Sequence, residues 1–219
     1  MTTAPHCSRV AVLGEYRDGV RALSEVTMGV DADRWAVRAC GTWTIEEVAR
    51  HVLAVADWYH AWLDRGLAGD GSPPFTSDEL EARNAQELAR RVAVPGNVAI
   101  EQFTERAASY GARVRDAWDT PYGFPSGTVT AGLHLAVAAA EWHLHAWDVA
   151  RAVGREHRPG DPETLLNAVI DCFAVARGGV EGNMLRTFAP AVARFGDPWA
   201  SLLRRSGRRP PFRWLRRRT

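Results

Sequence analysis

The residues best suited to chemistry lie in one alanine-rich stretch, AAAEWHLHAWDVA. An α-helix turns about 100° per residue, so Glu141, His145 and Asp148, spaced at i, i+4 and i+7, share one face. His134, two turns before Glu141, returns to that face. Ionisable groups beside a buried stripe lose hydration at high cost unless something pairs with them. The stretch therefore predicts either a metal ion or a hydrogen-bond network.

A third ligand comes from a second helical segment, TWTIEEVARHVLAVADWYHAWLDRG. The apolar stripe of this segment contains His51, between Val48 and Val55. If the two helices are neighbours, His51, Glu141 and His145 form an inward-facing set, which is how helical bundles build metal sites. Such a set with open positions suits Zn²⁺, and also Fe²⁺, Ni²⁺ or Mn²⁺. Spacing alone leaves open a hydrogen-bonded core histidine and a Glu–His salt bridge.

The elements that must position these side chains are helical, because helical spacing dominates and β-type alternation is scarce. Thr44 and Glu47 form a capping box that starts one helix, and Gly66 ends it. We expect loops at residues 29–41, at DGSPPFTS and at PYGFPSGT, and little regular structure after Gly196. The pattern predicts an all-α, four-helix-type bundle with an extra element. The expected helices cover residues 8–28, 44–66, 77–92, 98–118, 129–153 and 163–178.

Length and composition favour one soluble domain. The chain has 219 residues, of which 46% are hydrophobic and 24% charged. It contains no apolar stretch long enough for a bilayer, and MTTAPHCSRV lacks the apolar core of a signal peptide. Three widely spaced cysteines argue against a disulfide framework and against a thiolate metal site, and we expect Cys40 and Cys172 to be buried apolar groups. The expected compartment is the cytoplasm.

The basic charge gathers at the C-terminal end. Residues 204–219 hold eight arginines and no acidic residue. A functional interpretation is contact with nucleic acid or a membrane. We favour a solvated tail that pairs with the acidic body, because no aromatic-interleaved groove accompanies the charge. We therefore expect neither partner, and divide the chain into a bundle (1–203) and a basic tail (204–219).

Two motifs resemble a known family. GTWTIEEVARHV is similar to the "G-W-T-x-x-(D/E)-(L/V)-x-x-H" motif of DinB-like metal-binding bundles, in the branch named for mycothiol-dependent maleylpyruvate isomerase. AAAEWHLHAWDVARAVGRE resembles that branch's "E-x-x-x-H-x-W-D-x-A-x-A-x-G". FAPAVARFGDPWASLLRRSGRRPPF resembles the "G-R-x-P" ending of its short, single-bundle members. The resemblance spans about residues 8–212. It implies a DinB-like four-helix bundle with an additional C-terminal helix and an irregular basic tail.

The resemblance also implies roles at matching positions. His51, Glu141 and His145 would be the metal ligands, with zinc the commonest ion and nickel or iron as alternatives. Asp148 would hold the ring of His145 or His51, or move a proton. The alternative is a purely structural role, in which Asp148 orders the helix. His134 is either an extra ligand or second-shell base, or an ordinary core histidine.

Further positions carry less specific signals. Asn84 and Arg83 match a region that would meet a polar substrate, although a plain helix-surface role is equally open for both. Of the other histidines, His60 and His143 are expected to face away from the centre. His6 and His157 are expected in mobile segments.

The resemblance implies a divalent-metal-dependent transferase that activates a low-molecular-weight thiol, mycothiol, for addition to an electrophilic small molecule. The isomerase that names the branch has a second domain that helps complete its active site. Too few residues follow Gly154 for such a domain, so we do not expect maleylpyruvate isomerisation to transfer. A non-enzymatic metal- or small-molecule-binding bundle and a metal-dependent hydrolase or lyase remain alternatives. The expected partners are the thiol and a small-molecule substrate, with a homodimer left open.

Overall fold

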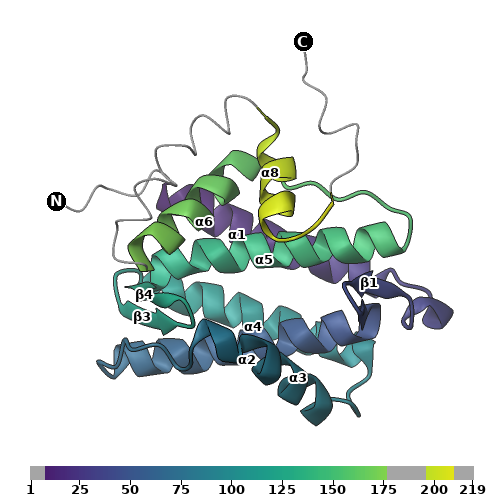
Figure 1. Ribbon diagram of the computed structural model, residues 1–219, viewed down its shortest axis with the longest axis horizontal. Coiled ribbons are helices and arrows are strands. Elements are labelled where there is room, and N and C mark those ends of the chain that lie inside the picture. Colours follow the sequence, from purple (N-terminus) through teal and green to yellow (C-terminus); the bar gives the residue numbers. More distant parts are fainter. Residues whose placement is uncertain (1–7, 177–195, 210–219) are drawn as a thin grey trace.

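Four long helices form the frame of the protein (Figure 1). The computed structural model describes residues 8–176 and 196–209. The all-α fold class predicted from the sequence is confirmed. In chain order, the frame helices are α1 (Arg9–Met28), α2 (Ile45–Leu67), α4 (Gly96–Asp116) and α5 (Ala131–Ala152).

Shorter helices complete the described part of the chain. The helix expected at 77–92 divides into a 3₁₀ turn, η2, followed by α3, and the helix expected at 163–178 is α6. The prediction of little regular structure after Gly196 is wrong, because α8 begins shortly after it. Asp197 explains this start, since its side chain accepts hydrogen bonds from the backbone N–H groups of Trp199 (2.9 Å) and Ala200 (3.3 Å). The short helices are η1 (Ala32–Arg34), η2 (Ser77–Glu79), α3 (Leu80–Arg90), α6 (Pro162–Ala176) and α8 (Pro198–Arg205).

Two small antiparallel hairpins precede the two helices that carry the predicted ligands. They are β1 (Arg38–Cys40) with β2 (Trp43–Thr44), and β3 (Pro121–Phe124) with β4 (Gly127–Thr130). Both segments were expected to be loops, and that prediction is wrong. Their strands are too short to show a clear alternation in the sequence, and tertiary packing stabilises them.

Close packing at Gly123 shows how the second hairpin is held. A Cβ atom at this position would lie 2.0 Å from the carbonyl oxygen of Ser72, so only glycine lets the strand approach the preceding loop. The neighbouring Tyr122 is fully buried. The β3–β4 hairpin is therefore packed tightly against the bundle.

Each hairpin ends on a threonine that caps the following helix. The Thr44 hydroxyl accepts a hydrogen bond from the Glu47 backbone N–H (3.2 Å), and the Glu47 carboxylate accepts one from the Thr44 N–H (2.8 Å). The predicted capping box is thus confirmed. Thr130 caps α5 in the same way, accepting a hydrogen bond from the N–H of Leu133 (3.2 Å). These caps fix the residue at which α2 and α5 each begin. They therefore also fix the direction in which the functional face of each helix points.

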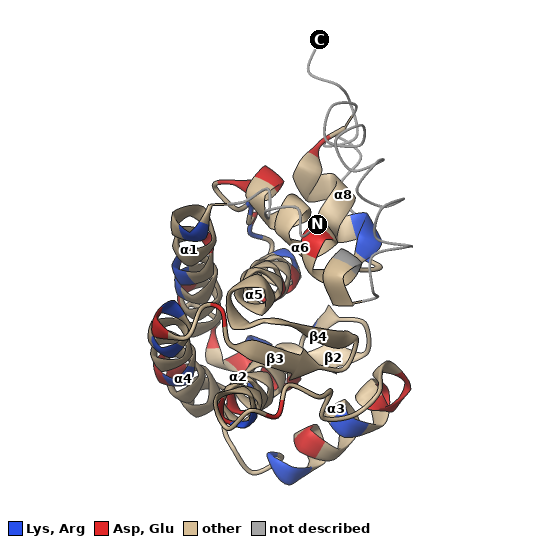
Figure 2. Cartoon of the chain, turned by 90° about the vertical axis from the view of Figure 1, so that its left-hand side faces the viewer, with Lys and Arg blue, Asp and Glu red and all other residues tan. Residues whose placement is uncertain are grey.

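Helix α5 is the centre of the core. Figure 2 shows it surrounded by α1, α2, α4 and α6, with charged residues mainly on the outward sides of the surrounding helices. Its alanines allow close approach, because Gly19 of α1 lies against the backbone of Ala139 and the side chain of Trp142. Trp142 is fully buried. No helix in residues 8–176 and 196–209 is both long enough and apolar enough to cross a membrane.

The cap of α2 can be tested by Thr44→Ala. Loss of the side-chain acceptor should lower the free energy of unfolding by about 1 kcal/mol, measured by urea denaturation. Thr76→Ala is the matched control, because Thr76 forms an equivalent capping box with Glu79 on an exposed 3₁₀ turn. An equal loss in both variants would contradict the role given to Thr44.

Candidate metal centre

Three predicted ligands from two helices converge inside the bundle. His51 of α2 and Glu141 and His145 of α5 each place one potential ligand atom within 4.8 Å of the other two. The Nε2 atom of His51 lies 3.6 Å from Oε1 of Glu141. The rings of His51 and His145 meet edge to face, with centroids 5.2 Å apart. The two helices are therefore neighbours, as the sequence interpretation assumed. The role of the three residues as metal ligands stays a prediction.

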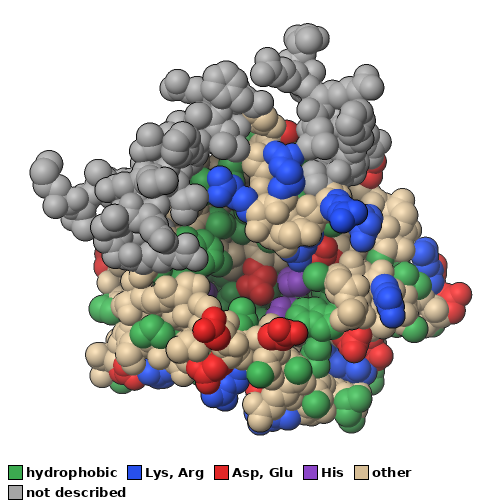
Figure 3. Space-filling view, viewed as in Figure 1, with side chains coloured by type: hydrophobic (Ala, Val, Ile, Leu, Met, Phe, Trp, Pro, Cys, Tyr) green, Lys and Arg blue, Asp and Glu red, His purple; other side chains and the backbone are tan. Residues whose placement is uncertain are grey.

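The three side chains lie at the edge of the core, where His51 and His145 are buried and Glu141 is partly exposed. The side chain of Glu141 is 24% exposed to solvent, whereas that of His51 is 7% exposed. Figure 3 shows acidic and histidine side chains on the floor of a hollow, with hydrophobic side chains around it. The ring of Trp43 covers one side of His51, with centroids 4.6 Å apart. A small molecule can therefore reach this site.

The ionisation of the site follows from burial and close partners. Burial alone would raise the pKa of Glu141, but contact with His51 and the charge of His145 outweigh burial and lower that pKa to about 2. Burial lowers the pKa of His51. Glu141 is therefore a carboxylate and His51 a neutral imidazole at neutral pH, the forms that coordinate metals.

Asp148 orients His145. Its Oδ2 atom lies 3.2 Å from Nδ1 of His145, and the Asp148 side chain is almost fully buried. Burial alone would lower the pKa of His145, but the hydrogen bond to Asp148 outweighs it and raises that pKa to about 9. Of the predicted roles of Asp148, this geometry matches the holding of His145 rather than His51.

Arg208 is the partner that sequence reasoning missed. Its guanidinium donates from Nε to Oδ1 of Asp148 (2.8 Å) and from Nη2 to Oδ2 (2.6 Å). The arginine of the "G-R-x-P" ending was the available signal, but its place in the basic tail predicted a solvated residue. Pairing with an acidic body does occur here, with a carboxylate inside the bundle. The division at residue 203 stays a prediction, and residues 210–219 lie outside the described part.

A second group of potential ligands surrounds the same histidine. Cys40, His145 and Asp148 also place ligand atoms within 4.8 Å of one another. The Arg208 guanidinium already occupies this group, because its Nη2 atom lies 3.6 Å from Sγ of Cys40 and also donates to Asp148. A fixed positive charge disfavours a cation there. Cys40 is only partly buried, contrary to expectation, whereas Cys172 is fully buried as predicted.

Tyr59 is a second residue whose role the sequence did not reveal. It is a buried residue of α2. Its hydroxyl donates a hydrogen bond to Oε2 of Glu141. Burial raises the pKa of Tyr59 well above its ordinary value, and the Glu141 charge adds to this, so the phenol keeps its proton.

His134 lies in an aromatic cage instead of among the three predicted ligands. Its ring stacks on Tyr122 (centroids 4.2 Å apart) and meets Tyr59 edge to face (4.5 Å). Its Nδ1 atom is 3.2 Å from the Tyr110 hydroxyl. Burial lowers the pKa of His134 to about 3, so the ring is neutral. This geometry favours the core-histidine interpretation.

The predicted substrate residues lie on α3. Arg83 places its guanidinium 5.5 Å from the centre of the Phe75 ring and is about half exposed. Asn84 is partly buried, and its Oδ1 atom has no hydrogen-bond partner among the described residues. Within the described part of the chain, Arg83 contacts Glu79 and Phe75 rather than the three predicted ligands, so its substrate role stays a prediction.

The remaining histidines lie away from the centre. His143 turns toward α1, where its Nε2 atom lies 3.2 Å from Oε2 of Glu15. Its Nδ1 atom lies 3.0 Å from Nε2 of His157, which is therefore packed against α5 despite the expectation of a mobile segment. His60 contacts the Arg106 carbonyl oxygen at 2.9 Å on the far side of α2. His6 lies outside the described residues.

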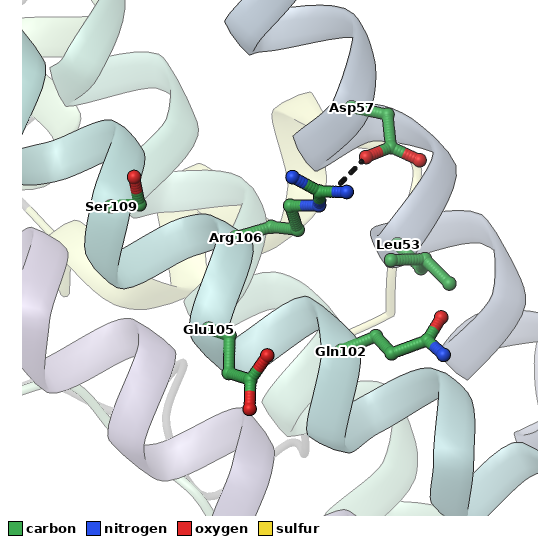
Figure 4. Close-up of a pocket in the computed structure, with 6 residues that line it drawn as sticks. All are labelled: Leu53, Asp57, Gln102, Glu105, Arg106 and Ser109. Atoms are coloured by element: carbon green, nitrogen blue, oxygen red, sulfur yellow. Dashed lines mark ion pairs between the residues drawn. The ribbon is translucent and has the colours of Figure 1, made fainter.

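A separate surface pocket of about 520 Å³ lies between α2 and α4 (Figure 4). Leu53, two residues after His51, lines it and so points away from the histidine. Asp57 and Arg106 form an ion pair of 3.4 Å beside it. Its lining contains no histidine or cysteine, so none of the three predicted ligands lies in this pocket.

An all-α bundle in which α2 and α5 bring two histidines and a glutamate together has the DinB-like arrangement. Within this class, the chain belongs to the family described as the mycothiol maleylpyruvate isomerase N-terminal domain, which matches residues 15–150. The predicted family is thus confirmed.

Two solved structures share the fold. The crystal structure of the mycothiol-dependent maleylpyruvate isomerase is 22% identical with a TM-score of 0.62. A histidine-to-alanine mutant of that isomerase is 23% identical with a TM-score of 0.57. Each match covers 78% of this chain and 71% of the other. None of the curated proteins matches the chain in sequence.

The Arg208 contact can be tested by Arg208→Ala. Removing one partner of a buried ion pair leaves the Asp148 carboxylate unpaired, which should lower the free energy of unfolding by about 3 kcal/mol. Urea denaturation measures this loss. Arg205→Ala is the control, because Arg205 is exposed at the end of α8. Equal stability of the two variants would show that Arg208 is only a surface residue.

The buried state of His134 predicts a pH dependence. Its pKa is about 3 in the folded protein and about 6.5 in an unfolded chain. Its contribution to stability is therefore present above pH 6.5 and is lost as the pH falls toward 3, with a slope of at most about 1.4 kcal/mol per pH unit. His134→Phe should flatten the loss of unfolding free energy between about pH 6 and 4. Parallel curves for variant and wild type would contradict this assignment.

Proposed function

We propose that this protein is a divalent-metal-dependent transferase that activates a low-molecular-weight thiol, mycothiol, and adds it to an electrophilic small molecule. One observation carries the proposal: His51, Glu141 and His145 place their ligand atoms within 4.8 Å of one another, at the edge of the core where Glu141 is partly exposed. Membership of a family named for a mycothiol-dependent isomerase supports the choice of thiol.

The donor set fits a divalent ion. Zinc bonds of about 2.1 Å place two ligands of a tetrahedral site roughly 3.4 Å apart, and His51 and Glu141 are separated by 3.6 Å. Asp148 engages Nδ1 of His145, so the other ring nitrogen is the one that would coordinate, and metal binding would displace its proton. We propose zinc, with nickel or iron as alternatives. A bound ion would lower the pKa of a thiol and so supply a thiolate at neutral pH.

Other residues of the chain would position the metal ligands and bind the substrate. Both oxygens of Asp148 are engaged by Arg208, and one also by His145, so we assign Asp148 to positioning and not to proton transfer. The Asn84 side-chain oxygen lacks a partner among the described residues and suits a hydroxyl or amide donor of a polar ligand. Arg83 belongs to the same proposed substrate side of the site. The addition itself forms one carbon–sulfur bond as one π bond of the electrophile breaks, and the proton that the thiol loses is returned to the product.

Metal binding is tested first. Wild-type protein purified without chelator should contain close to one divalent ion per chain, measured by elemental analysis. His51→Ala removes one of three ligands and should lower the metal affinity by at least about 100-fold. His60→Ala is the matched control, because His60 lies on the same helix but contacts Arg106 and Arg113 instead. Equal metal content in both variants would overturn the ligand assignment.

Thiol chemistry is tested second, with metal-loaded protein. Conjugation of a model electrophile should proceed with mycothiol and stop after Glu141→Ala. Metal binding without conjugation of any candidate thiol would favour the hydrolase or lyase alternative, or a binding protein. The predicted cytoplasmic location and homodimer are not addressed by this test and stay predictions.

A further inference from the structure

Tyr59 is a buried residue in contact with a proposed ligand. It lies on α2, two helical turns after His51, and only 4% of its surface is exposed. Its hydroxyl donates a hydrogen bond to Oε2 of Glu141, because a carboxylate has no proton to give. A buried tyrosine hydroxyl normally finds a hydrogen-bond partner, and here that partner is a proposed metal ligand.

Four neighbouring rings fix the position of that hydroxyl. Tyr59 contacts Trp62 (centroids 5.6 Å apart), Tyr110 (5.5 Å), His134 (4.5 Å) and Trp142 (5.7 Å). Packed rings on several sides leave no room for a different side-chain rotamer. The donor is therefore preorganised, and Glu141 has to adapt to it.

The two oxygens of Glu141 consequently face different partners. Oε2 accepts the hydrogen bond from Tyr59, whereas Oε1 is the oxygen nearest to His51, at 3.6 Å. A carboxylate can bind a metal through one oxygen or through both. A strong hydrogen bond to one oxygen disfavours its use as a second ligand, because that oxygen would have to give up its partner in a buried place.

We propose that Tyr59 is a positioning residue that restricts Glu141 to coordination through Oε1 alone. The proposal rests on the proposed function, since it assumes a metal ion held by His51, Glu141 and His145. One-oxygen binding by Glu141 leaves an additional coordination position open. The tyrosine thereby keeps room at the ion for the thiol that the reaction requires.

The test compares Tyr59→Phe with Tyr110→Phe, using Co²⁺ as the probe. Both variants delete one hydroxyl from a fully buried ring of the same cluster, but the Tyr110 hydroxyl contacts His134 and not Glu141. Tyr59→Phe frees Oε2, so the visible d–d bands of bound Co²⁺ should weaken as the coordination number rises. The affinity of the cobalt protein for added mycothiol should fall by about 10-fold. Tyr110→Phe should match the wild type in both measurements.

The possible outcomes distinguish a failure of the metal centre from a failure of the role proposed for Tyr59. If wild-type protein takes up no Co²⁺, the proposed metal centre and this inference both fail. If it takes up Co²⁺ but Tyr59→Phe gives the same bands and the same thiol affinity, only the role of Tyr59 is overturned. Equal effects of both variants would show that any lost hydroxyl disturbs the cluster, which also overturns it.

A measurement on wild-type protein covers the case in which Tyr59→Phe does not fold. X-ray absorption of the zinc-loaded protein distinguishes a carboxylate bound through one oxygen from one bound through two. One oxygen at bonding distance supports the proposal, and two oxygens overturn it. Absence of zinc uptake counts against the metal centre itself.

Discussion

The structure depends on how ionisable groups at the edge of an apolar core find partners. A buried charge or polar group without a partner costs several kcal/mol, and α5 carries a glutamate, three histidines and an aspartate on largely buried positions. Each of these groups has a fixed neighbour. Glu141 has His51 and Tyr59, and Asp148 has His145 and Arg208. These contacts tie α2, α5 and the segment after α8 together, so stability and the geometry of the site have the same origin.

The partners also separate two candidate cation sites that share His145. On one side, Asp148 and Cys40 face the Arg208 guanidinium, which supplies the positive charge from within the protein. On the other side, Glu141 contacts His51 and Tyr59 and no arginine of the described residues, and its side chain is 24% exposed. The Arg208 charge therefore disfavours a cation beside Asp148, and Asp148 is left to orient His145. The proposed metal site is accordingly the one that includes Glu141.

Sequence reasoning predicted the local features well. Hydrophobic periodicity gave the four long helices to within a few residues, and the Thr44–Glu47 pair gave the start of α2, because both depend on neighbours in the chain. It was wrong about the two hairpins and about the segment after Gly196. The β3–β4 hairpin is held by contacts such as Gly123 against Ser72, which are distant in sequence and leave no local pattern. Helix α8 was not predicted because its segment is rich in arginine and proline, although Asp197 provided an N-cap signal.

The sequence by itself determined which side chains share a face of α5 and that His51 lies on the buried stripe of α2, because the helical period fixes these relations. It also identified the family through two motifs. Only the tertiary structure decided that the two faces meet, that Tyr59 engages one oxygen of Glu141, and that Arg208 closes over Asp148. The physical reason is that helix packing and long side chains join residues separated by 60 to 94 positions, and no local preference encodes such contacts.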